Sequence, residues 1–240
     1  MMSSSALCLP PLLTAHAAVS ATSPEEAARL GAEAGHYGAG DLVWQASAEG
    51  VAMALVLEPE VSPELCRQML FVGMVAAADA IGALIPPEVG ITWDWPSTLR
   101  ANDGIVGHVS LEMSETFDGA GAPDWLVLGL RVALHANVGE GAEPGLTPDR
   151  TTLYDEGCGE IAAEDLISAW ARHLLTWIDT WQQDGFAPVR EAWTFRARGR
   201  EDGEAEIERD GTLYRGRVRG LDDRGGLLLE GDAGSVLLEL

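Results

Sequence analysis

The sequence predicts an α+β fold, in which a β-sheet packs against helices and a small all-β domain follows. Alternating apolar residues mark a β-hairpin over residues 91–111. Two long segments with apolar residues at helical spacing, 63–85 and 163–184, predict the helical layer. Because the composition then shifts, we place one domain over residues 1–195 and a small C-terminal β domain over residues 196–240.

The first half of the chain contains clear start and stop signals for its elements. After an extended lead-in, Ser23 caps a short helix whose first residue is Pro24. Residues 51–57 are nearly all apolar, which is typical of a strand buried on both faces. The other expected elements are a helix ending near Glu33, strands over 41–45 and 125–134, a helix from Pro63 to Ile85, and a loop over 140–150.

The second half carries a tryptophan stripe and a strong turn signal. Trp170, Trp177 and Trp181 recur at helical spacing, and we expect them to pack in the core rather than form a ligand box. Asp210-Gly211 predicts a hairpin, with strands over 226–230 and 235–240 completing a small barrel or sheet. A two-residue turn would pair Glu206 with Arg215, Glu204 with Arg217 and Asp202 with Arg219. These arginines would then be neutralised rather than form a phosphate-binding stripe.

The charge composition excludes several classes of function. The net charge is −23, and all 15 basic residues are arginines, so the chain has no lysine. Mechanisms that use a Schiff-base lysine or a P-loop lysine are therefore excluded. The negative charge also argues against binding to nucleic acids or to anionic membranes.

Cysteine usage and the N-terminal stretch bear on localisation. Cys8, Cys66 and Cys158 fit neither a disulfide framework nor a zinc signature, so we expect reduced thiols and no metal site. The apolar residues 7–13 lack a preceding basic residue, and we expect no signal peptide. The longest apolar segment carries two charged residues, so we expect no transmembrane helix and a cytoplasmic protein.

The predicted hairpin resembles the signature of the biotin protein ligases, K-W-P-N-D followed by N-G-x-K. Trp95, Pro96 and Asn102 match this pattern, whereas Asp94 and Ile105 fall where the ligases have their two lysines. Three further stretches are similar to other motifs of the family: 127–132, 185–188 with Trp193, and 219–228. The resemblance covers about residues 35–240. It implies a mixed, mostly antiparallel sheet packed against helices, followed by an SH3-like barrel.

The resemblance also implies a reaction, and the replaced residues argue against it. The ligases activate biotin with ATP and transfer it to a lysine of a carrier protein, using an arginine-rich loop that is matched here by residues 37–44, without any arginine. Stabilising an acyl-phosphate transition state requires fixed cations. We therefore expect a pseudoenzyme that requires no cofactor and binds biotin, or a related small acid, in the retained pocket.

We expect the ligand to be held by residues of the hairpin and the strand that follows it. Arg100 and Arg131 could each bind a carboxylate, or else lie in an exposed turn or pair with a neighbouring acid. Ser97 and Thr98 could donate hydrogen bonds to the ligand or merely cap the turn. The candidate ligand-binding residues are Trp95, Ser97, Thr98, Arg100, Ile105, Gly107 and Arg131.

Two alternatives stay open. An ATP-independent acyltransferase of the lipoyl/octanoyl transferase type would use Cys158 as its nucleophile, with His108 or His135 approaching it, although Glu156 nearby would raise its pKa. A protein-interaction module would instead favour a basic partner, because the chain is acidic. A carrier-protein partner and a homodimer formed through sheet edges are expectations from the fold analogy alone.

Overall fold

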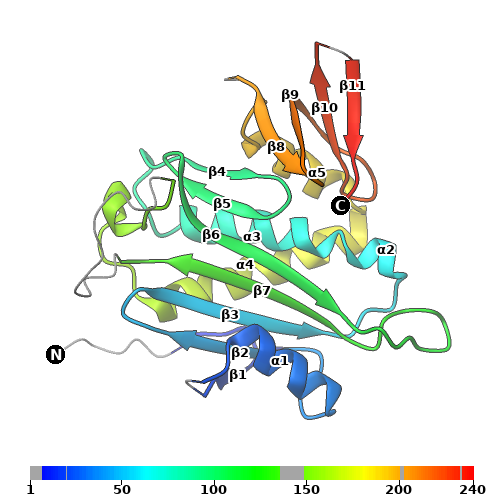
Figure 1. Cartoon of the computed structure of the whole chain (residues 1–240). Coiled ribbons are helices and arrows are strands. Elements are labelled where there is room, and N and C mark those ends of the chain that lie inside the picture. Colours follow the sequence, from blue (N-terminus) through cyan, green and yellow to red (C-terminus); the bar gives the residue numbers. More distant parts are fainter. Residues whose placement is uncertain (1–6, 20, 136–148, 201–202, 233) are drawn as a thin grey trace.

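The computed structural model describes residues 7–19, 21–135, 149–200, 203–232 and 234–240. A seven-stranded sheet has the order β1-β2-β3-β7-β6-β5-β4, and a four-stranded sheet has the order β11-β10-β9-β8 (Figure 1). The strands β1 and β2 pair in parallel, and the other neighbours in both sheets are antiparallel. The predicted α+β fold, with a mixed, mostly antiparallel sheet and a small C-terminal sheet, is confirmed. The division of the chain at residue 196 stays a prediction.

The elements have the following bounds. The large sheet contains β1 (Thr14–Ala17), β2 (Asp41–Ala46), β3 (Gly50–Leu57), β4 (Ile91–Asp94), β5 (Thr98–Ala101), β6 (Gly104–Met113) and β7 (Leu126–Ala133). The small sheet contains β8 (Ala205–Arg209), β9 (Thr212–Leu221), β10 (Leu227–Gly231) and β11 (Gly234–Leu238). The helices are α1 (Pro24–Glu33), α2 (Pro63–Cys66), α3 (Met69–Gly82), the π-helical turn η1 (Tyr154–Cys158), α4 (Ala163–Asp184) and α5 (Ala187–Arg196).

Helices cover the two faces of the large sheet unequally. The long helices α3 and α4 lie behind the sheet, whereas α1 covers only part of the front (Figure 1). Alternate residues of β3 accordingly enter two separate cores: Met53 packs with the α3 and α4 side, and Ala54 packs with Ala28 of α1. The strand is therefore buried on both faces, as its sequence predicted. Among the described residues, no helix covers the front face beyond α1.

The tryptophans of α4 contribute to the core, as expected. Each indole N–H donates a hydrogen bond to α3 or to the residue before it: Trp170 to the Gly73 carbonyl, Trp177 to Asp79 and Trp181 to Gln68. A buried indole usually finds such a partner, because an unpaired N–H is costly inside a protein. The stripe therefore holds α4 against α3 rather than forming a ligand box.

Four expected elements differ from the structure. The helix expected over 63–85 is broken between α2 and α3, where the amides of Gln68 and Leu70 bond three residues back instead of four. The hairpin over 91–111 is a meander of three strands: the predicted turn at Asn102 and Asp103 joins β5 to β6, and a further turn over residues 95–97 joins β4 to β5. Gly185, with φ of 76°, ends α4, and a further helix, α5, follows it. The residues of β1 were expected to belong to an extended lead-in, and they instead form a strand that pairs with β2.

One of the three ion pairs predicted for the arginines of the C-terminal sheet is confirmed. Arg215 forms an ion pair of 2.8 Å with Glu206 across the predicted turn. Arg219 instead pairs with Glu230 of β10, and Arg217 also faces that residue in register. In the described part of the chain, Glu204 forms no ion pair with Arg217 because β8 begins only at Ala205, opposite Gly216, and β9 continues beyond that end. Asp202 lies outside the described residues.

The C-terminal sheet is joined to the large domain by a tight turn. Trp95 Nε1 donates to the Gly225 carbonyl at 3.0 Å, and Gln68 Nε2 donates to the neighbouring Asp223 carbonyl at 2.7 Å. Gly225 has φ of +83°, and a Cβ atom at this position would lie 2.3 Å from the Phe71 ring. The turn therefore requires glycine both for its conformation and for its close approach to α3.

Replacing Gly225 by alanine is expected to lower the free energy of unfolding by about 2–4 kcal/mol, the sum of left-handed strain and overpacking. Urea denaturation measures this loss. Gly35→Ala is a matched control, because Gly35 has φ of +68° with no atom within 4 Å of its added Cβ. Equal losses for the two variants would show that the contact with Phe71 contributes nothing.

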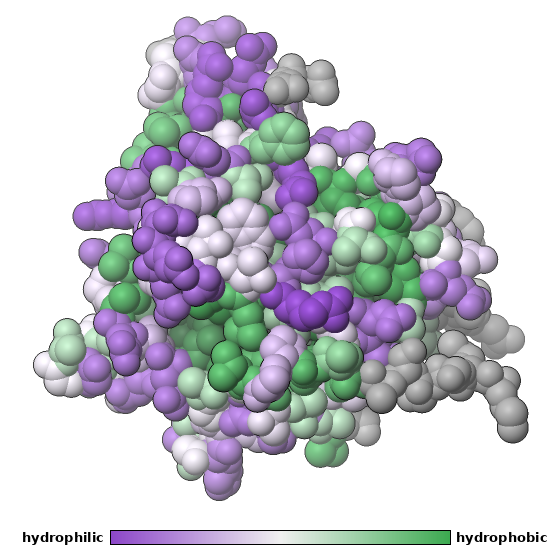
Figure 2. Space-filling view, turned by 180° about the vertical axis from the view of Figure 1, so that it is seen from behind, coloured by the Kyte–Doolittle hydropathy of each residue, from purple (hydrophilic) through white to green (hydrophobic). Residues whose placement is uncertain are grey.

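One described segment is long and apolar enough to cross a membrane, judged by length and composition: residues 63–82. However, 78% of its most apolar window is buried inside the protein, as in the core helix of a globular domain. The back of the molecule shows hydrophobic patches interrupted by hydrophilic residues (Figure 2).

Candidate ligand-binding site

A cavity of about 780 Å³ lies on the open front face of the large sheet. Residues paired directly across antiparallel strands present their side chains on the same face. One such row crosses five strands, from β5 through β6, β7 and β3 to β2, and every member lines the cavity: Thr98, His108, Arg131, Ala52 and Gln45. We call this cavity the sheet pocket.

Arg131, a predicted ligand residue, is already bound to a carboxylate of the protein. Its Nε and Nη2 atoms each donate to Glu25 at 2.6 Å, in a bidentate pair between β7 and the first turn of α1. This pair raises the pKa of the guanidinium. Of the two roles considered for Arg131, the structure shows the pair with a neighbouring acid.

Arg150 is a cation of the sheet pocket that the sequence analysis missed. Its backbone forms a parallel bridge with Ile105, whose N–H bonds to the Asp149 carbonyl at 2.7 Å. No ion pair involves Arg150 within the described part of the chain. The sequence motif predicts that Ile105 takes the place of the ligases' second lysine, and Arg150 lies beside Ile105. An arginine at the end of a long loop gave no signal of this.

His108 lies between Thr98 and Arg131 in the same row. Loss of hydration lowers the pKa of His108, and the positive charges of Arg131 and Arg150 lower it further, while Glu25 acts in the opposite direction. His135, with its ring 5.5 Å from that of Tyr154, also lines the pocket. Bound anions would therefore meet two imidazoles as well as the arginines.

The lowered pKa of His108 predicts a small stability loss in acid. Below pH 6.5, His108 is protonated more readily in the unfolded chain than in the folded chain. The free energy of unfolding therefore falls as the pH drops from 6.5 through the lower pKa of His108 in the folded protein. We expect His108→Gln to remove a loss of less than about 1 kcal/mol, since the side chain is solvent-accessible. Urea denaturation at pH 5 and pH 7 measures it, with His36→Gln as an exposed control. If His108→Gln lost the same stability between pH 7 and pH 5, another titrating group would be responsible for the loss.

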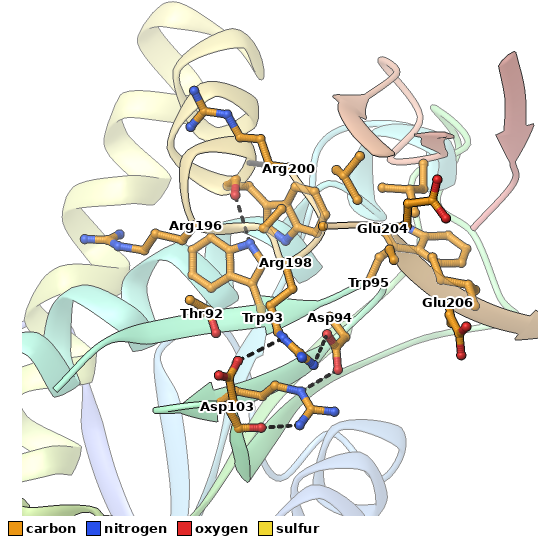
Figure 3. A pocket seen from close by; sticks show the side chains of 18 of the residues that line it. Thr92, Trp93, Asp94, Trp95, Asp103, Arg196, Arg198, Arg200, Glu204 and Glu206 are labelled. Atoms are coloured by element: carbon orange, nitrogen blue, oxygen red, sulfur yellow. Dashed lines mark hydrogen bonds and ion pairs between the residues drawn. The ribbon is translucent and has the colours of Figure 1, made fainter. Parts of the chain in front are cut away.

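A second cavity, of about 770 Å³, extends from β4 and α5 to β8, and holds a network of charged residues. Arg100 Nε donates to Asp94 at 2.5 Å. Arg198 lies 3.3 Å from Asp94 and 3.3 Å from Asp103, so the acids and arginines neutralise one another (Figure 3). Asp94, which the sequence motif predicts to take the place of the ligases' first lysine, is thus bound by two arginines.

The structure therefore separates the predicted ligand residues. Thr98, Ile105, Gly107 and Arg131 line the sheet pocket. Trp95 and Arg100 line the second cavity, where Trp95 also anchors the C-terminal turn. Ser97 lines neither cavity, and its carbonyl accepts a bond from the Val109 amide.

Cys158 has none of the features of a nucleophile. Its side chain is 8% exposed within the main core, and it does not line the sheet pocket. Burial raises the pKa of its thiol, and Glu156 raises it further, whereas a reactive cysteine needs a lowered pKa. Among the described residues, no group of three or more His, Cys, Asp or Glu side chains is placed to hold a metal ion.

Comparison with solved structures first defines the class of fold. A biotin protein ligase from Aquifex aeolicus, solved in complex with biotin and ATP, matches with a TM-score of 0.70 over 95% of this chain and 94% of that one. At 16% identity this likeness shows the fold alone. A biotin protein ligase-like protein of unknown function from Silicibacter sp. TM1040 matches with a TM-score of 0.84 and 36% identity, over 98% and 97% of the two chains.

Sequence comparison then gives the family. The chain matches the biotin/lipoate A/B protein ligase family over residues 9–195, and it belongs to that family. A biotin–[acetyl-CoA-carboxylase] ligase of Paracoccus denitrificans is 33% identical over 197 residues, which cover 81% of this chain and 80% of the relative. The resemblance found in the hairpin motif is thereby confirmed.

Proposed function

We propose that this protein binds a small carboxylic acid, such as biotin or a related acid, in the sheet pocket and does not carry out the usual ATP-dependent ligation. The observation that carries the proposal is Arg150, a guanidinium on the pocket wall without an ion-pair partner among the described residues. A guanidinium in this state can bind one carboxylate through two parallel hydrogen bonds.

The rest of the described lining suits an acid with an apolar body. Thr98 supplies a hydroxyl group in the same row as Arg131, whereas the hydroxyl of Thr152 is already bonded to Asp155. The walls between them are aliphatic and would cover the hydrocarbon part of the ligand, as is usual in small-molecule sites. The aliphatic lining residues whose side chains are not buried in the main core are Ala52, Ile105 and Ala133.

The charges of the described lining do not suit a nucleoside triphosphate. Glu25 neutralises Arg131, and Glu49 also lines the pocket, so Arg150 is the main unbalanced cation. At the other two positions where a ligase has cations, Asp94 is held by arginines and Asp41 accepts a bond from His16 at 2.7 Å. Transfer through an acyl-adenylate needs several fixed cations around the phosphates. These features support binding without adenylation.

A thermal-shift panel tests the proposal, because a ligand that binds only the native state raises the melting temperature. We expect biotin, lipoate or octanoate to stabilise the protein, and ATP with magnesium to leave it unchanged. Stabilisation by ATP alone, or no response to any acid in the panel, would contradict the proposal. The acyltransferase alternative would require Cys158 to react with a thiol reagent in the folded protein, and its burial does not favour this.

A further inference from the structure

The second cavity is a groove with the edge of a β-sheet as one wall, and the end of α5 with the turn that follows it as the other. Residues 204–208 line one wall consecutively, and residues 195–200 line the other. Because successive side chains of a strand point to opposite faces, consecutive residues line one cavity only where it meets the edge of the strand. The strand β8 is an outer strand of the four-stranded sheet, so the edge that pairs with no described strand faces this groove.

The charges left unpaired in the groove are acidic. In Figure 3 the labelled arginines lie across the cavity from Glu204 and Glu206. The arginines have partners: Arg196 pairs with Asp79 at 3.0 Å, Arg198 pairs with Asp94, and Arg200 donates to the Phe195 carbonyl. On the opposite wall Glu206 pairs with Arg215.

Two acids of the β8 wall remain for a ligand. Glu204 and Glu208 form no ion pair within the residues that the structure describes. They are separated by an even number of residues, so both side chains lie on the same face of the strand. The groove therefore presents two like charges at strand spacing, in a protein whose net charge is −23.

The floor of the same groove contains unused hydrogen-bonding groups. Two buried side-chain polar atoms lack a partner in the described part of the molecule, Thr92 Oγ1 and Trp193 Nε1, and both residues line this groove. Buried polar groups are nearly always hydrogen-bonded, so an unpartnered indole N–H is unusual. At the rim, Phe195 is 73% exposed and offers an aromatic surface. These features together indicate an unfilled binding groove.

We propose that the free edge of β8 pairs with an extended, lysine- or arginine-rich segment of a partner protein, which becomes a fifth strand of the small sheet. Main-chain hydrogen bonds to the edge supply affinity in such complexes, and pockets for alternate side chains supply specificity. Basic side chains at alternate positions of the segment would lie beside Glu204 and Glu208. Its carbonyl oxygens would be acceptors for the unused groups of the floor. This inference concerns a different cavity from the proposed carboxylate site and stands independently of it.

Fluorescence anisotropy with labelled synthetic peptides at physiological salt tests the pairing. We expect the protein to bind a peptide of alternating lysine and valine, and not one of alternating glutamate and valine. A third peptide keeps the lysines but has proline at its central valine, which removes a main-chain donor and blocks the ladder. We expect it to bind at least about tenfold more weakly, the effect of losing about 1.4 kcal/mol. Equal binding of the proline peptide would reduce the interaction to general charge attraction and overturn the proposal.

Paired variants locate the site on the molecule. We expect Glu204→Gln with Glu208→Gln to weaken binding of the lysine peptide about fivefold, and Glu64→Gln with Glu160→Gln, exposed acids elsewhere, to leave it unchanged. Amide hydrogen exchange should slow at β8 when the peptide binds. Equal losses of affinity in the two double variants would overturn the proposal. A concentration-dependent dimer in sedimentation, with β8 protected from exchange in the absence of peptide, would also overturn it, because the occupant of the groove would then be a second copy of this chain.

Discussion

Trp193→Ala is expected to reduce the free energy of unfolding by about 3–5 kcal/mol, the usual cost of deleting a large buried aromatic side chain. Trp193 is fully buried, stacks on Trp93 with ring centroids 6.1 Å apart, and meets Phe71 edge-on at 5.7 Å. Its carbonyl also accepts the indole N–H of Trp93 at 2.8 Å. The cluster thus joins α5, β4 and α3, and truncation would leave a cavity where all three meet.

Urea denaturation of two variants of α5 measures this effect. Phe195→Ala removes an exposed aromatic from the same helix and is expected to cost less than about 0.5 kcal/mol. The Trp193 indole N–H has no hydrogen-bond partner among the described residues, so Trp193→Phe removes only packing contacts. It should therefore reduce the free energy of unfolding far less than Trp193→Ala does. Similar losses for Trp193→Ala and Phe195→Ala would show that the aromatic cluster does not stabilise the junction.

Arg150→Gln is expected to weaken binding of the preferred small acid by at least about tenfold, because hydrogen bonds to charged groups contribute about 1.5–3 kcal/mol. The side chain lies at the surface of the sheet pocket, so the variant should fold normally. Isothermal titration calorimetry with the acid identified in the thermal-shift panel measures the change in affinity.

The matched control is Arg172→Gln, which removes the same charge from the exposed side of α4. It should bind the acid as the unmodified protein does. If both variants lost affinity equally, long-range charge rather than a direct contact would explain the effect. Unchanged affinity in Arg150→Gln would show that the acid does not bind at Arg150.

Periodicity and end signals predicted most of the fold. The helix expected over 163–184 has those bounds, and Ser23 caps α1 by accepting a bond from the Glu26 amide. What local signals could not predict depended on distant contacts. Gln68, which lies where the expected long helix breaks, bonds to the C-terminal turn more than 150 residues away. Arg219 of β9 pairs with β10, whereas Arg215 pairs with β8, because the length of β8 decides which neighbour each arginine meets.

The site was predicted less well than the fold, for the same reason. Register across five strands brought Thr98, His108 and Arg131 into one row, and a hairpin motif alone contains no information about that row. Arg131 was recognised as basic, but its partner Glu25 is 106 residues away. The most informative cation, Arg150, comes from a loop that pairs with β6 only in the folded chain.

The most direct test of the account is ATP–pyrophosphate exchange with biotin, lipoate and octanoate, run beside calorimetric titrations of the same acids. The charges of the sheet pocket predict that an acid binds with the same affinity in the presence or absence of ATP and magnesium, and that no exchange occurs above background. Exchange that depends on the acid would contradict the account, since it would show that the protein forms an acyl-adenylate without the cations of a usual ligase.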